Sequence, residues 1–87
     1  MSTYLSKEGK SQVEAFQFGK DEYPKWFKNR LGYDVRLMNG AGIISVLIDG
    51  HDTVYQGDYI LKHDRGNLTK MKEIEFNQKY RQLWKVY

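Results

Sequence analysis

Cysteine is absent from this sequence, proline occurs only once, and no apolar run approaches the roughly 20 residues that a membrane-spanning helix needs. Without cysteine the chain has neither a disulfide framework nor a thiol or cysteine-ligated zinc site. The opening residues, MSTYLSKEGK, also lack the hydrophobic region of a secretory signal peptide. These absences predict an intracellular protein that neither spans a membrane nor leaves the cell by the secretory route.

The length and composition are typical of one small folded domain, which we place at residues 1–87 with a flexible N-terminal segment at 1–10. A chain of this size buries only about 60–65% of the surface that its unfolded form exposes, so its core is expected to be compact and shallow. Aromatic residues make up 15% of the sequence, which indicates that rings carry much of the packing.

The first part of the chain predicts a strand followed by a short helix. Apolar and polar residues alternate imperfectly over residues 12–18, which favours a strand. Residues 22–31 begin with an acid and a proline and end with basic residues, the order that helix capping favours. Within this helix Tyr23, Phe27 and Leu31 recur every four residues and are expected to face the core.

The middle of the chain predicts antiparallel strands joined by tight turns. Residues 33–38 alternate as a strand with one wet face does, and the Asn-Gly pair at 39–40 is a favoured hairpin turn. Residues 43–48, IISVLI, are almost continuously apolar and predict a strand buried on both faces. The loop at 49–53 contains Asp-Gly, which supplies a position with positive φ.

The last part of the chain predicts a bent strand, a return strand and a helix. The strand over residues 54–61 is expected to bend at Gly57, because glycine inside a strand marks a bulge or a close bend. A turn at 64–67 leads to a strand over 68–72, and the spacing of rings and leucine in residues 72–87 predicts an amphipathic C-terminal helix.

These elements define an α+β fold class, a single small domain with a curved antiparallel β-meander. A short helix follows the first strand, and the amphipathic helix closes the chain. In the strand before the last hairpin, Tyr59 and Leu61 should point to one face of the sheet and Ile60 to the other.

Few residues are placed for chemistry. His51 and His63 are each followed by an aspartate, but the two pairs fall in loops at opposite ends of one predicted strand, and Asx turns explain the aspartates without a metal. Only Thr53 lies near His51 as a nucleophile, and no glycine opens a helix as a phosphate-binding loop does. We therefore expect a protein that is not an enzyme and holds no metal and no cofactor.

Positive charge is concentrated toward the C-terminus. Residues 1–61 hold seven Lys or Arg against eight Asp or Glu, whereas residues 62–87 hold seven against three. A solvated helix face is the commoner explanation of such a bias, and an acidic partner is the alternative. The candidate partner-binding residues combine these cations with aromatic rings: Trp26, Arg65, Lys70, Lys72, Lys79, Arg81, Trp84, Lys85 and Tyr87.

Several short stretches together resemble a family of small phage and prophage proteins. They are VEAFQF near the start, GDYILK in the middle, the glycine of the following turn, and the aromatic pair Phe76 and Tyr80. In that family a VEAFQW-like strand opens the chain, and a GDYIIKG strand, a short hairpin and a helix with Phe and Tyr close it. This sequence departs from the pattern at LTKMK, where the family has an aromatic-Pro-Cys stretch, and in its added tail LWKVY.

The resemblance implies a phage accessory protein without an assigned activity, located in the cytoplasm of the infected bacterial host, and it carries over no catalytic residue. Our leading hypothesis is a non-enzymatic binding protein that engages a bacterial or phage protein and blocks a host process or an antiviral defence such as a CRISPR system. The alternative is a nucleic-acid-binding accessory protein in which the basic C-terminal third contacts phosphates and Trp84 or Tyr87 stacks on bases.

The apolar strand at 43–48 also raises the question of assembly. Two short helices cover one face of a sheet in so small a domain, so something else must cover the other face. Either the sheet curls so that Ile43 and Leu47 pack against the N-terminal strand, or a second copy packs there as a homodimer. We expect the homodimer, because the tail LWKVY offers further apolar surface.

Overall fold

The computed structural model describes residues 2–6 and 12–82, which form eight strands and two helices. Four strands and a one-turn helix make up the first half: β1 (Ser2–Ser6), β2 (Gln12–Gln17), α1 (Lys25–Lys28), β3 (Val35–Gly40) and β4 (Ile43–Ile48). The second half comprises β5 (Asp52–Tyr55), β6 (Tyr59–Lys62), β7 (Leu68–Met71), α2 (Glu73–Lys79) and β8 (Tyr80–Gln82). The predicted α+β class with antiparallel strands and two helices is confirmed.

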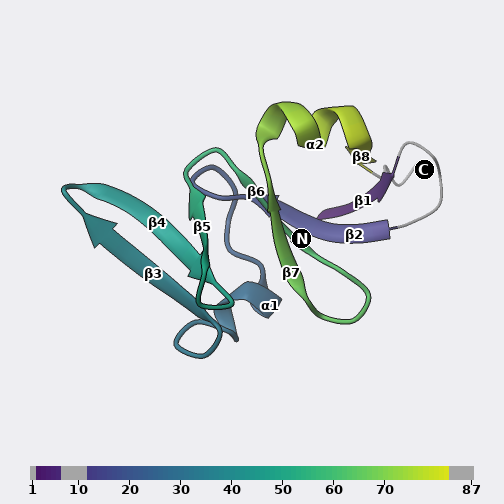
Figure 1. Ribbon diagram of the computed structural model, residues 1–87. Coiled ribbons are helices and arrows are strands. Elements are labelled where there is room, and N and C mark those ends of the chain that lie inside the picture. Colours follow the sequence, from purple (N-terminus) through teal and green to yellow (C-terminus); the bar gives the residue numbers. More distant parts are fainter. Residues whose placement is uncertain (1, 7–11, 83–87) are drawn as a thin grey trace.

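The strands form two antiparallel sheets instead of one continuous meander. The larger sheet has the order β7-β6-β2-β1-β8, and the smaller sheet has the order β3-β4-β5 (Figure 1). The chain leaves the smaller sheet after Tyr55 and enters the larger one at Tyr59. Gly57, with φ of 98°, lies in this crossing, so the bend predicted there is where the chain changes sheets.

Two neighbouring interior strands of the larger sheet, β2 and β6, carry apolar side chains on both faces. Phe16 and Ile60 belong to the main core, which also receives α1 and the smaller sheet. Ala15 and Leu61 point the other way, into a second core under α2. The predicted alternation of Ile60 against Tyr59 and Leu61 is confirmed, because Tyr59 also packs in the second core.

The helix predicted over residues 22–31 is only one turn long. Glu22, the acid at the start of the predicted range, precedes the helix, and Asp21 before it accepts a hydrogen bond from the Gln17 backbone N–H at 2.8 Å in the turn after β2. Pro24 precedes the first helical residue, and no side chain caps the helix. The rings nevertheless face inward as predicted: Phe27 is fully buried, and Tyr23 and Leu31 pack against the main core.

The β3–β4 hairpin turns two residues later than predicted. Ala41 and Gly42, with φ of 53° and 78°, form the turn, and β3 continues through Asn39 and Gly40. This register pairs Val35 with Ile48 and Leu37 with Val46 and gives six cross-strand pairs. A turn at Asn39 and Gly40 would instead place the polar Asp34 opposite Ser45 and would separate these apolar pairs.

The prediction that residues 43–48 are buried on both faces is wrong. Val46 and Ile48 are fully buried in the main core, whereas Ile44 is 41% exposed and Leu47 is half-buried. Leu47 points away from the main core, and Ile44 lies near the far end of the β3–β4 hairpin, which extends away from the larger sheet (Figure 1).

Both ends of the described chain differ from expectation. Ser2–Ser6, within the segment predicted to be flexible, forms β1 and pairs with β2 and β8. The C-terminal helix ends at Lys79, and the next residues form β8 because the edge of β1 offers them backbone hydrogen bonds. The remainder of both predictions, at residues 7–10 and 83–87, lies outside the described residues. Within the described part of the chain, neither helix has the length and apolar character needed to cross a membrane.

Candidate functional site

The face of the smaller sheet that points away from the main core carries an unusual set of side chains. We call it the outer face and define it by Arg36, Met38, Leu47, Thr53 and Tyr55, together with Ser45. Strand alternation places these residues opposite the buried Val35, Val46 and Val54. Met38 and Tyr55 are 48% and 52% exposed, so large apolar surface remains open there.

Cross-strand pairing arranges the outer face in two adjacent rows. Arg36 lies beside Leu47, which lies beside Thr53, and Met38 lies beside Ser45, which lies beside Tyr55. A cation, a thioether, an aliphatic side chain and a phenol therefore come from three neighbouring strands and share one surface.

A hollow of about 520 Å³ lies at the base of the outer face. Its lining comes from the α1–β3 turn, the two long strands and the β4–β5 turn: Tyr33, Asp34, Arg36, Leu47, Asp49 and Gly50. Tyr33 is 81% exposed and borders the hollow. The hollow makes one end of the outer face concave.

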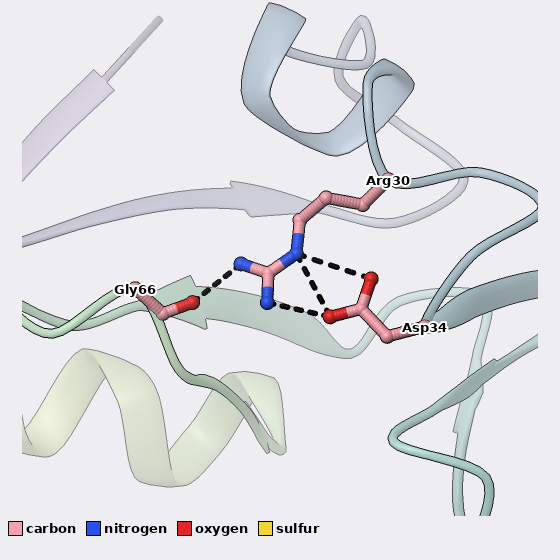
Figure 2. A network of polar contacts seen from close by, with 3 residues as sticks. All are labelled: Arg30, Asp34 and Gly66. Atoms are coloured by element: carbon pink, nitrogen blue, oxygen red, sulfur yellow. Dashed lines mark hydrogen bonds and ion pairs between the residues drawn. The ribbon is translucent and has the colours of Figure 1, made fainter.

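Asp34, one of the acids that line this hollow, is paired with Arg30. Asp34 Oδ2 accepts hydrogen bonds from Arg30 Nε at 3.0 Å and from Nη2 at 2.6 Å, while Nη1 donates to the Gly66 carbonyl (Figure 2). The hydrogen bond from Arg30 holds the pKa of the Asp34 carboxyl below its usual range, and the Arg30 charge adds to this effect. Asp34 is thus a charged structural anchor, positioned by Arg30.

Arg36 is in a different situation. Its guanidinium forms no hydrogen bond or ion pair with any residue of the described ranges 2–6 and 12–82, and the residue is exposed. An arginine that is fixed on a strand but left unpaired can give five hydrogen-bond donors to a partner. The outer face therefore combines open apolar surface with one available cation.

The predicted partner-binding residues whose side chains the structure describes come from α1, the β6–β7 loop, β7 and α2 with its N-cap. Lys70 Nζ donates to the Thr53 carbonyl at 2.8 Å, and Lys72 Nζ lies 3.7 Å from the Asp58 carboxylate. These two lysines line a small hollow of about 180 Å³ beside Tyr55. Their side chains hold the edge of β7 to the β5–β6 segment.

The other predicted residues come from other elements. Lys79 Nζ is 3.3 Å from Glu75 on α2, and Arg65 is exposed in the β6–β7 loop. Trp26 is half-buried and packs against Phe16, with 5.7 Å between ring centroids. Arg81 lies in β8, but its side chain is outside the described part of the structure, as are residues 84, 85 and 87.

The histidines each find a partner close by in the chain. His51 Nδ1 lies 2.8 Å from the Asp49 carbonyl oxygen, and His63 Nε2 lies 2.7 Å from Thr69 Oγ1. In the ranges that the structure describes, no three His, Cys, Asp or Glu side chains group closely enough to hold a metal ion.

The sequence reasoning missed the outer face. One signal was available, because Met38 shares with Asp34 and Arg36 the side of its strand that was predicted to be wet. A large apolar residue on such a side is informative when its neighbours share the same face. The contribution of Leu47 and Tyr55 depended on the pairing of three strands, which a single segment does not reveal.

Comparison of the chain with models of protein families, with curated proteins and with solved structures finds no match.

Proposed function

We propose that this chain is a non-enzymatic binding protein that engages a bacterial or phage protein through the outer face of its smaller sheet. The resemblance of its VEAFQF and GDYILK stretches to small phage and prophage proteins supports a role in the cytoplasm of an infected bacterial host. There it would block a host process or an antiviral defence.

The observation that carries this proposal is the exposed combination of Arg36, Met38 and Tyr55 on one sheet face. Arginine, methionine and tyrosine are enriched in protein–protein interfaces, and tyrosine and arginine are common among the residues that dominate binding energy. The open hollow beside Arg36 offers a place for a side chain of the partner.

The charges favour a protein over a nucleic acid as the partner. Phosphate binding needs cations that are free to replace counterions. Lys70, Lys72 and Lys79 instead lie against a carbonyl or a carboxylate of this chain. Lys62, the first cation of the basic third, lies 3.8 Å from Glu14.

The experiment compares two exposed arginines, Arg36 and Arg65. The wild-type chain, Arg36→Glu and Arg65→Glu are immobilised, and each is used to capture proteins from a bacterial host lysate. We expect a protein retained by the wild type to be reduced at least tenfold by Arg36→Glu, because a cation at the interface is replaced by an acid, and to be kept by Arg65→Glu.

Two results contradict the proposal. Equal retention by both variants removes the outer face as the binding surface. Loss with Arg65→Glu alone, accompanied by retained nucleic acid, supports the alternative that the basic C-terminal third binds phosphates.

A further inference from the structure

One edge of the smaller sheet is formed by β3, whose backbone groups can be assigned to two sides. The Val35 N–H donates to the Arg30 carbonyl at 3.3 Å, and the Gly32 N–H donates to the Val35 carbonyl at 2.9 Å. Both bonds lie on the side of β3 that faces away from β4. Because the N–H and C=O of every second residue point to the same side of a strand, Leu37 and Asn39 also present theirs away from β4.

These four backbone groups of Leu37 and Asn39 form no hydrogen bond with any residue in the described ranges. An unpaired strand edge of this kind is a template on which another strand can add. The side chains beside it are apolar and open: Leu37 and Met38 are each 48% exposed.

We propose that a second copy of this chain adds its own β3 to this edge, antiparallel and about a two-fold axis at Met38. In this register Leu37 of each copy lies opposite Asn39 of the other, and each such pair exchanges two hydrogen bonds. The four bonds use the N–H and C=O groups of Leu37 and Asn39 in both copies.

No other register does this. A shift of two residues in one direction places Asn39 opposite Val35 of the second copy, whose N–H and C=O are already bonded within its own chain. A shift in the other direction places Leu37 opposite Ala41, which lies in the hairpin turn. The edge is therefore complementary to itself at a single alignment.

The side chains fit the same alignment. The two Met38 residues face each other as a pair without hydrogen bonds, with Cα atoms about 4.5 Å apart, and the two Leu37 side chains meet diagonally on the opposite face. Arg36 lies opposite Gly40 of the second copy, so no like charges are opposed. This edge-to-edge dimer differs from the face-to-face dimer expected from the sequence.

The pairing extends the outer face across both copies and leaves it open. Because the dimer uses the backbone edge of β3, it does not depend on the binding function proposed above.

Cysteine cross-linking tests the register, since the chain has no cysteine of its own. Met38→Cys should give a disulfide-linked dimer under mild oxidation, because cross-strand pairs at about 4.5 Å lie within disulfide range. Arg36→Cys is the matched control on the same face of the same strand. Its two copies would lie about 13 Å apart, four residues along the ladder, and should remain unlinked.

Light scattering at micromolar concentration gives an independent readout. The wild type should have about twice the 10.3 kDa mass of one chain. Met38→Lys, which opposes two like charges at an exposed position, should return the mass to one chain. The proposal is overturned if the wild type has the mass of one chain, if Met38→Cys does not cross-link, or if Arg36→Cys cross-links equally well. A monomeric wild type would leave the β3 edge available to a strand of a different protein.

Discussion

Arg30 connects two segments that lie far apart in the sequence, the α1–β3 turn and the β6–β7 loop (Figure 2). Its hydrogen bonds to Asp34 raise the pKa of the guanidinium and lower that of the carboxyl. The two side chains are 27% and 35% exposed, so solvent screens the pair in part. The bidentate geometry still fixes the orientation of the α1–β3 turn, because Arg30 Nε and Nη2 both donate to the Asp34 carboxylate.

The pair makes a prediction about pH. Asp34→Asn should lower the free energy of unfolding by about 1 kcal/mol near neutral pH, as expected for a charge-assisted pair that is partly screened. Because the folded pKa of Asp34 is lowered, its stabilisation is present above the unfolded value of about 3.9 and is lost as pH falls through the folded pKa. Urea unfolding of both proteins across this range should show the two stabilities converging at acidic pH.

Asp64→Asn is the matched control for this measurement. Asp64 is exposed in the β6–β7 loop and forms no ion pair with a described residue. Its substitution should change stability by less than about 0.5 kcal/mol at any pH. A difference between Asp34→Asn and the wild type that stays constant as pH falls would show that the carboxyl charge is not what stabilises the turn.

Among the elements, the β3–β4 turn carries the clearest local strain. Ala41 has φ of 53°, a left-handed conformation that costs an alanine about 1–2 kcal/mol, whereas asparagine tolerates it. Ala41→Asn should therefore raise the free energy of unfolding by about 0.5–1 kcal/mol, measured by urea denaturation. Ala41→Val should lower it, because a β-branched residue fits this conformation poorly. Equal stability of the wild type, Ala41→Asn and Ala41→Val would show that residue 41 does not hold the left-handed position of the turn.

The same turn shows where local pattern fails. Asn39 and Gly40 have the composition of a hairpin turn, but the inward pairing of Val35 with Ile48 prevails and moves the turn to Ala41 and Gly42. The helix prediction fails for a related reason. Pro24 has an extended backbone, so the helix begins only at Lys25, and the Arg30 and Leu31 N–H groups bond to carbonyls three residues back instead of four. By contrast, the alternation around Ile60 was enough to place its neighbours on the correct faces.

At the scale of the whole molecule, the parts that the sequence could not predict are the long-range pairings. Tyr4 lies opposite Gln82 in the β1–β8 pair. The alternation of apolar and polar residues within a segment does not indicate a contact between residues 78 positions apart. The outer face has the same origin, because Met38 becomes part of a surface only when β4 and β5 lie beside it. Composition and alternation predicted the α+β class; pairing between distant segments decided how the strands divide into two sheets.

This division into two cores leads to a prediction about cooperativity. Phe76 of α2 lies in the second core and is 1% exposed, with its ring stacked on Tyr59 at 3.9 Å between centroids. Phe76→Ala should lower the free energy of unfolding by about 3–5 kcal/mol through lost burial and the cavity left behind. That is a large share of the roughly 4–13 kcal/mol expected for a domain of this length.

The loss should be felt on the opposite side of the larger sheet, because β2 and β6 contribute residues to both cores. In a Trp84→Phe background Trp26 is the single tryptophan, and it packs in the main core. Its fluorescence and the far-ultraviolet circular dichroism should shift to the same lower urea midpoint in Phe76→Ala, since the domain unfolds as one unit. Ile74→Ala on the same helix, at a position that is 76% exposed, should leave both midpoints in place. If the Trp26 signal kept its original midpoint while the circular dichroism lost amplitude early, the two cores would be separate folding units that happen to share a sheet.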